Sequence, residues 1–482
     1  MTIAPEDIAQ AVAKALTSLA PAAFTKPDVA AGPAAGASTV VYSEIADGIF
    51  DDVDTAVAAA KKAQKAYMGS TMKFRKRVID AIREFIRVPE NLQYMAEQAV
   101  LQTGMGNVHD KILKNRYVAD LTPGVEDLVT EAWSGDEGLT TVELSPFGVI
   151  GAITPTTNPT ETILCNSIGM LAAGNAIVFS PHPRAAALSV WLVQQLNAVL
   201  AGVGAPANLI TMVREPSIEN TEALMAHRDI SMLVATGGPG IVRTVLSSGK
   251  KAIGAGAGNP PAVVDATADV KQAAHDIIDG CTFDNNLPCT AEKEVIAVDA
   301  ITDLLIFEME KYGAYLVKDP EELKRLEELI VNGRHPHTEW IGKSALEIAR
   351  GAGIEVPTNT RVLIAETDVK HPFVQVELMM PVLGIVRATD VDQAIEWAIQ
   401  CEHGFRHTAM MHSTDVNALT KMGKLIQTTI FVKNGPSYSG LGIGGEGYIT
   451  FTIAGPTGEG LTSARTFTRK RRCVLVGALN VR

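Results

Sequence analysis

One cysteine has neighbours that would suit a nucleophile. Cys289 follows Leu287 and Pro288 within residues 283–294, and the apolar residues 295–298 come directly after that run. A thiol held between a proline-containing turn and a strand lies on a rigid edge, where the carbon of a substrate can approach it. The alternative is a buried structural cysteine, because most unpaired cysteines serve as small apolar side chains. The spacing by itself leaves both interpretations open.

The composition limits the class of protein. The chain has 482 residues, 46% of them hydrophobic, so at least two domains with their own cores are expected. Its 42 basic and 54 acidic residues give a formal net charge of −12, which disfavours nucleic acids and anionic membranes as partners. The five cysteines form no C-x-x-C pair, so we expect neither a disulfide framework nor a metal site. We find no secretion signal and no apolar run long enough to cross a bilayer, and expect an intracellular protein.

The first 38 residues differ from the rest of the chain. Apolar residues recur at helical spacing between residues 5 and 19, which predicts an amphipathic helix over residues 1–20. Residues 21–38 are rich in Ala, Pro and Gly and are typical of a linker. A tethered helix of this kind needs a partner for its apolar face, so we expect it to dock on another protein. A helix that folds back on its own domain is the alternative.

Strand-like and helical segments alternate along the remaining chain. Before residue 256 the strand-like runs are residues 140–144, 149–154, 176–180, 209–213 and 230–235, and after it they are residues 262–264, 295–298, 362–365 and 385–388. Predicted helices separate most of them, beginning with residues 53–67, 75–88, 160–173 and 185–200. This alternation predicts the α/β class, with parallel sheets covered by helices on both faces. We therefore expect two doubly wound, Rossmann-like domains.

A glycine-rich turn follows one of these strands. Thr236, Gly237, Gly238 and Gly240 lie between the strand that ends at residue 235 and a predicted helix over residues 241–248. Backbone N–H groups at the start of a helix can face a phosphate. The spacing is not G-x-G-x-x-G, and many turns of this composition bind nothing. Phosphate binding and a purely structural turn both remain open from the local pattern.

Several segments, in this order, resemble the aldehyde dehydrogenase superfamily, and more narrowly its coenzyme-A-acylating branch of the ethanolamine- and propanediol-utilisation type, which is associated with bacterial microcompartments. The resemblance runs from about residue 40 to the end. It is carried by residues 154–159, 283–294, 376–381, 402–408, 457–460 and 465–469.

The resemblance implies a division of the chain. Residues 39–127 and 147–256 would form the dinucleotide-binding domain, and residues 257–445 the catalytic domain. Residues 128–146 and 465–482 would form a β-hairpin flap that pairs subunits of a homodimer or homotetramer, since such strands cover each other's open edges.

The resemblance also implies a mechanism. The Cys289 thiolate would add to the carbonyl carbon of an aldehyde, while the Asn158 side-chain amide and the Cys289 backbone N–H hold the resulting oxyanion. Hydride transfer to NAD would leave an acyl thioester on Cys289. Without the resemblance, Asn158 before Pro159 could equally be a turn residue.

A departure from the hydrolytic branch indicates the product. Where that branch has a glutamate that activates water, alignment places Gly254, and residues 251–261 contain no carboxylate. Coenzyme A would then accept the acyl group, giving acyl-CoA. A glycine turn shaped only for close backbone approach is compatible with this reading.

Dinucleotide contacts are implied for eleven residues: Thr154, Pro155, Ser180, His182, Thr236, Gly237, Gly238, Gly240, Gly254, Glu377 and Met379. Glu377 would hold the nicotinamide ribose, and we expect NAD in preference to NADP on family grounds. His403 and His407 are expected to be structural. The basic residues 469–472 would form a solvated or subunit-facing edge, or attract the phosphates of coenzyme A.

These observations favour a cytoplasmic enzyme, contained in a microcompartment, that reversibly oxidises an aldehyde of the acetaldehyde or propionaldehyde class. The N-terminal helix would bind the shell. Three alternatives stay open: an acyl-phosphate reductase of the same fold, a hydrolytic enzyme that releases the free acid, and a non-enzymatic adaptor.

Overall fold

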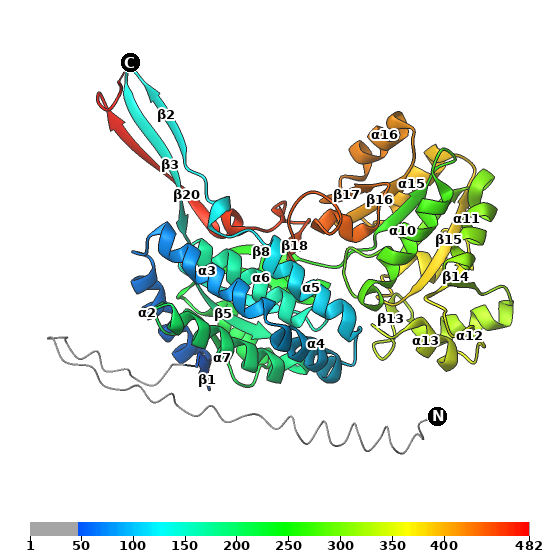
Figure 1. The fold of residues 1–482 in the computed structure, drawn as a ribbon, viewed down its shortest axis with the longest axis horizontal. Coiled ribbons are helices and arrows are strands. Elements are labelled where there is room, and N and C mark those ends of the chain that lie inside the picture. The colour runs from blue at the N-terminus through cyan, green and yellow to red at the C-terminus, as the bar shows by residue number, and fades with distance from the viewer. Residues whose placement is uncertain (1–46, 482) are drawn as a thin grey trace, which may run out of the picture. The chain divides into compact units, whose positions relative to one another are not determined.

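A computed structural model of the chain describes residues 47–481. The predicted targeting helix and the linker of residues 21–38 lie outside the described residues. Within the described part the chain forms two α/β sheets with their helices and a separate antiparallel sheet (Figure 1).

The first sheet is parallel throughout. Its order is β1 (Ile49–Phe50), β6 (Ile210–Val213), β5 (Ala176–Pro181), β4 (Val149–Thr154), β7 (Ile230–Thr236) and β8 (Lys251–Ala255). Every residue of β4, β5 and β6 is buried, as expected for strands covered on both faces. The helices of this half are α2 (Val53–Tyr67), α3 (Met72–Arg87), α4 (Pro89–Thr103), α5 (Val108–Leu121), α6 (Pro159–Ala172), α7 (Ala186–Gly202), α8 (Ile218–Ala226) and α9 (Pro239–Leu246).

The second sheet is also parallel. Its order is β11 (Ala314–Leu316), β14 (Val362–Glu366), β15 (Val382–Ala388), β10 (Glu294–Val298), β9 (Pro261–Val264), β16 (Thr408–His412) and β17 (Ile430–Lys433). Its helices include α10 (Val270–Thr282), α11 (Asp299–Lys311), α12 (Pro320–Ile330), α13 (Ala345–Gly351), α15 (Val391–Cys401) and α16 (Val416–Ile426). The predicted class, with two Rossmann-like α/β parts, is confirmed.

The third sheet projects from the first α/β part (Figure 1). Strand β3 (Gly138–Pro146) pairs antiparallel with β2 (Glu131–Gly135) and with β20 (Thr468–Val476). We call these three strands the flap. Asn175 ties its base to the first domain, because its Oδ1 accepts the N–H of Phe147 at 2.8 Å and its Nδ2 donates to the carbonyl of Phe467 at 2.9 Å.

Two expectations need correction. By length and composition Pro183–Gly202 is long and apolar enough to cross a membrane, whereas no such run had been expected. In the structure this segment includes α7, whose Leu188, Leu192, Leu196 and Leu200 are buried in the protein core, which is why the helix is apolar. In addition, residues 251–255 form strand β8, whereas no strand had been predicted there.

Candidate active site

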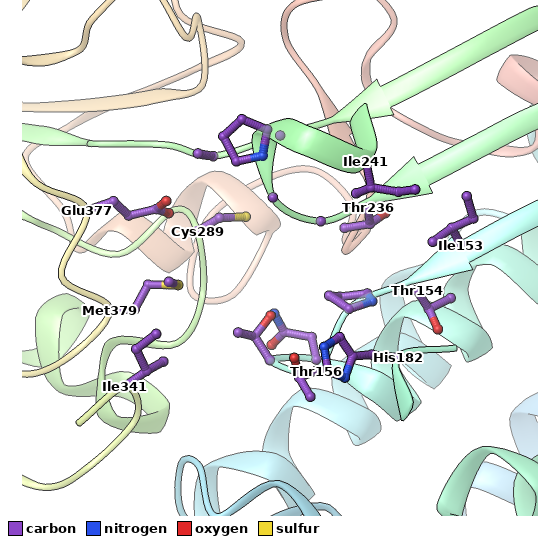
Figure 2. Close-up of a pocket in the computed structure, with 18 of the residues that line it drawn as sticks. Ile153, Thr154, Thr156, His182, Thr236, Ile241, Cys289, Ile341, Glu377 and Met379 are labelled. Carbon is purple, nitrogen blue, oxygen red and sulfur yellow. The ribbon is translucent and has the colours of Figure 1, made fainter. Parts of the chain in front are cut away.

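A cavity of about 740 Å³ lies at the carboxyl ends of strands β4, β5 and β7. This end of a parallel sheet is where α/β proteins usually bind ligands. Figure 2 shows Ile153, Thr154, Thr156, His182, Thr236 and Ile241 facing Cys289, Ile341, Glu377 and Met379 across the cavity. Eleven of the thirteen predicted site residues line it, namely Cys289, Asn158, Thr154, Pro155, Ser180, His182, Thr236, Gly237, Gly238, Glu377 and Met379.

Gly240 and Gly254, the other two predicted residues, are not among the residues that line the cavity, so the structure does not bring them together with the rest. Gly254 belongs to β8, and a Cβ added to it would lie 2.7 Å from Cγ1 of Val242 in α9. A side chain there would therefore point into the helix. Gly256 lines the cavity instead, and a Cβ added to it would meet no heavy atom within 4 Å. The missing side chain beside the cavity is thus at position 256.

An unusual turn presents Cys289. Asp284, Asn285 and Asn286 have φ values of 48°, 53° and 68°, in the left-handed region that Asp and Asn tolerate better than most residues. The buried ammonium of Lys293 holds this turn by donating to the carbonyl of Asn286 at 3.0 Å and to that of Pro288 at 3.4 Å. The backbone segment that leads to Cys289 is therefore held in place by hydrogen bonds from a buried lysine.

The environment of Cys289 disfavours the thiolate. Burial raises the pKa of the Cys289 thiol to about 12, Glu377 raises it further, and Lys293 opposes both. Burial also raises the pKa of Glu377, whose Oε1 accepts the N–H of Gly258 at 3.3 Å. Glu377 and Glu222 are the two carboxylic acids among the described lining residues. Of these two acids, Glu377 is the one whose charge acts on the Cys289 thiol.

The opposite side of the cavity suits a dinucleotide. Gly238 is the N-cap of α9 and Pro239 its first residue, so the N–H groups of the first turn are free of intrahelical partners. A Cβ added to Gly238 would meet nothing within 4 Å, which leaves room for a pyrophosphate against the backbone. Burial lowers the pKa of His182, and Arg184 lowers it further, so the ring is neutral at neutral pH. These residues fit NAD.

The two histidines near residue 405 lie at different depths. His403 lines the cavity, with Nε2 3.0 Å from the carbonyl of Gln375. His407 is buried behind the wall, where a Cβ on Gly258 would approach its Cγ to 2.8 Å. Burial lowers the pKa of His407 to about 4, with a further contribution from Lys293, so this ring is also neutral at neutral pH.

Several lining residues were missed from the sequence. Arg334 and His335, at the hairpin of β12 (Val331–Asn332) and β13 (His335–Pro336), bring basic groups to the cavity, whereas residues 469–472 lie on the flap strand β20 and do not line it. A hairpin this short has no periodic signal in the sequence. An apolar cluster of Met105, Leu287 and Ile341, with Met379 against it, adjoins Cys289 in the same cavity.

Comparison with known proteins gives one family. The model of the Aldehyde dehydrogenase family matches residues 33–446. The chain is 48% identical over 437 residues to propanal dehydrogenase (CoA-propanoylating) from Citrobacter freundii, covering 90% of this chain and 94% of that protein.

Two solved structures are similar throughout. Propionaldehyde dehydrogenase from Rhodopseudomonas palustris, with bound CoA and an acylated cysteine, is 60% identical with a TM-score of 0.89, over 90% of this chain and 100% of that one. A propionaldehyde dehydrogenase from the Clostridium phytofermentans fucose utilisation bacterial microcompartment is 52% identical with a TM-score of 0.88, over the same shares. Two variants of the latter protein have also been solved, one with a cysteine and one with a histidine replaced by alanine. The two altered positions are 118 residues apart, and Cys289 and His407 are separated by the same number of residues in this chain.

The negative charge of Glu377 should have a measurable effect on the reactivity of the Cys289 thiol. Replacing Glu377 by Gln removes a negative charge that raises the thiol pKa, so the pKa of Cys289 should fall and its alkylation at a fixed alkaline pH should become severalfold faster. Iodoacetamide labelling of Cys289, followed by peptide mass spectrometry across a pH series, measures this. Glu222→Gln, at the other lining carboxylate, is the matched control and should label at the wild-type rate. Equal or slower labelling of Glu377→Gln would contradict the assignment.

Proposed function

We propose the function of this protein from one premise, that the chain belongs to the aldehyde dehydrogenase family. It is a coenzyme-A-acylating, nicotinamide-dinucleotide-dependent oxidoreductase, which converts a short-chain aldehyde, NAD and coenzyme A to acyl-CoA and NADH. The observation that carries the proposal is that the Cys289 thiol faces a cavity and that the residue at position 256 of the cavity wall is a glycine, which has no side chain.

Cys289, Glu377 and Asn158 have different roles in the first half of the reaction. Cys289 Sγ forms a bond to the carbonyl carbon, and its proton passes to the neighbouring carboxylate of Glu377 (Figure 2). The carbonyl oxygen becomes an oxyanion, to which Asn158 Nδ2 and the Cys289 backbone N–H donate. Bound NAD supplies the hydride acceptor. Cys289 then carries the acyl group as a thioester.

The second half depends on what can attack the thioester. A side chain at position 256 would enter open space in the cavity, but glycine supplies no general base there to activate water. The thiol of coenzyme A is the better nucleophile, so its sulfur bonds to the acyl carbon and Cys289 leaves as the thiol. The relative from Rhodopseudomonas palustris, solved with CoA and an acylated cysteine, supports this sequence of events.

The cavity favours a small apolar aldehyde. Met105, Leu287, Ile341 and Met379 present hydrocarbon surface, with no charged group among them, to the space that adjoins Cys289. Burial of a methyl or ethyl group there is favourable by about 0.8 kcal/mol for each carbon. We therefore infer a substrate of the acetaldehyde or propionaldehyde class, in line with the name of the Citrobacter freundii relative.

The acyl acceptor can be tested directly. With propionaldehyde and NAD, the wild-type protein should form NADH continuously only when coenzyme A is present, and propionyl-CoA should accumulate in equal amount. Without coenzyme A, NADH formation should stop after about one equivalent per site, because the thioester persists. Absorbance at 340 nm and mass spectrometry measure both products.

Two variants of the protein, and an assay with phosphate in place of coenzyme A, complete this experiment. Cys289→Ala should lose the activity, and Cys473→Ala, at an exposed cysteine on the flap, should keep it. Continuous turnover to free acid without a thiol acceptor, or equal rates with phosphate in place of coenzyme A, would contradict the proposal in favour of the hydrolytic enzyme or the acyl-phosphate reductase.

The flap supports assembly with further copies of the chain. Trp133, Val474, Leu475, Val476 and Leu479 are exposed large apolar side chains on the flap and directly after it. Apolar groups gathered on a projecting sheet are typical of a protein interface. We propose that the flap pairs subunits of a homodimer or homotetramer.

A charge on this surface should break the assembly. Val474→Asp combined with Val476→Asp should lower the molar mass of the protein in solution to that of a smaller species, because aspartate cannot be buried unpaired in an apolar interface. Size-exclusion chromatography with light scattering measures the mass. Val416→Asp, at an equally exposed valine on α16, is the control. An unchanged mass for the double variant would contradict the assignment.

We also propose that residues 1–20 address the enzyme to the shell of a bacterial microcompartment. The apolar periodicity of residues 5–19 supports a docking helix, and the relative from Clostridium phytofermentans is a microcompartment protein. The enzyme then acts inside the compartment, in the cytoplasm.

Deletion of residues 1–20 should abolish loading into purified shells and leave the specific activity unchanged, because the described cavity residues all follow residue 104. Co-purification with shells and assay of both fractions measure this. A fusion of residues 1–38 to a fluorescent protein should be loaded. Loading of the truncated enzyme at the wild-type level would contradict the proposal.

A further inference from the structure

Four charged side chains are buried directly behind Asn158. Lys111 and Lys114 come from α5, Glu161 from α6, and Asp284 from the turn before Cys289; each is at most 1% exposed. The cluster holds two ammonium groups and two carboxylates. Removing such groups from water is costly, and a buried cluster of this kind is weak evidence for stability alone. Its function must be sought in what it contacts.

Three oxygen atoms surround the Lys114 ammonium. Nζ lies 2.7 Å from Asn158 Oδ1, 2.5 Å from Asp284 Oδ2 and 2.9 Å from Glu161 Oε1. The contacts to Asn158 and Asp284 are hydrogen bonds, and the contact to Glu161 is an ion pair. The pKa of Lys114 is raised because Asp284 and Glu161 together outweigh the cost of burial. The group is therefore charged in the resting protein.

This charge determines which way the Asn158 amide faces. Because an ammonium only donates, the amide atom 2.7 Å away must be the oxygen, and the NH2 group is turned to the other side. There it lies 3.2 Å from Thr157 Oγ1, and both residues line the cavity. Rotating the amide by 180° would bring an NH2 group against the ammonium.

The same ammonium also reaches the nucleophile segment. Asp284 lies five positions before Cys289, and its Oδ1 accepts the backbone N–H of Asn107 at 2.9 Å, while its own N–H donates to Asp110 Oδ2 at 2.8 Å. Lys114 thus joins the amide donor on one domain to the turn that carries the thiol on the other.

We propose that Lys114 is a positioning residue that holds the Asn158 NH2 group toward the substrate oxyanion and, through Asp284, fixes its place relative to Cys289. This inference rests on the proposed aldehyde oxidation, in which the oxyanion forms. Lys114 does not contact the substrate. Its effect on the rate passes through Asn158.

The test is a double-mutant cycle on the full-length enzyme with propionaldehyde, NAD and coenzyme A. Lys114→Met should lower kcat by about tenfold to a thousandfold, up to the effect of losing one oxyanion donor, and should change KM for the aldehyde little. In an Asn158→Ala background the same substitution should change kcat by less than about threefold, because the donor that it positions is already absent. A simple packing defect would lower kcat by the same factor in both backgrounds.

Matched variants separate charge removal from positioning. Lys111 is equally buried and donates to Asp284 at 3.0 Å and to the carbonyl of Thr157, but has no recorded hydrogen bond to the Asn158 side chain. Lys111→Met should therefore lower stability but change kcat of the folded protein by less than about threefold. If Lys114→Met does not fold, the combination Lys114→Met with Glu161→Gln removes one positive and one negative charge together, and Glu161→Gln alone is its reference.

The outcomes are distinct. Equal losses of kcat for the Lys111 and Lys114 variants, or an equal effect of Lys114→Met with and without Asn158, would overturn the inference while the wild-type enzyme remains active. Absence of coenzyme-A-dependent activity in the wild-type protein would instead overturn the proposed function.

Discussion

The site depends on the exclusion of water from charged groups. Burial raises the pKa of Cys289 and Glu377 and lowers that of Lys293 and His407, so each of these four groups is pushed toward its neutral form. Lys114 is the opposite case, because two carboxylates keep it charged in a fully buried position. Burial thus disfavours the charged form of the groups around the thiol, while a charged lysine lies behind them. Charge that develops during the reaction is met by donors already in place.

The sequence predicted elements well where a single pattern dominated. The limits of α2 and β4 agree with the structure, because α2 has a clear amphipathic stripe and β4 is a short, wholly buried run. Helix α5 was missed for a physical reason. Its buried face includes Lys111, Lys114 and Asn115, so its apolar periodicity is interrupted where the helix enters the core. The lysines that support the site were missed with it.

Side-chain direction was the other limit. The alignment that selected Gly254 located the right segment, but Gly254 lies inside strand β8 against Val242 of α9, whereas Gly256 follows the end of the strand and borders the cavity. The structure assigns that place to Gly256. Residues predicted from the resemblance, such as Cys289, Asn158 and Glu377, do line one cavity, because they lie in segments that the fold brings together irrespective of their separation in sequence. The resemblance supplied their proposed roles, which composition and periodicity did not.

The glycine at position 256 has a consequence for the release of the acyl group from the protein. Because position 256 has no side chain to activate water, the proposed enzyme keeps each acyl group covalently attached until a carrier arrives. Oxidation of the aldehyde is then limited by the concentration of free coenzyme A, and without coenzyme A the protein stays acylated. The missing side chain thereby couples each turnover of the proposed enzyme to the arrival of one carrier molecule.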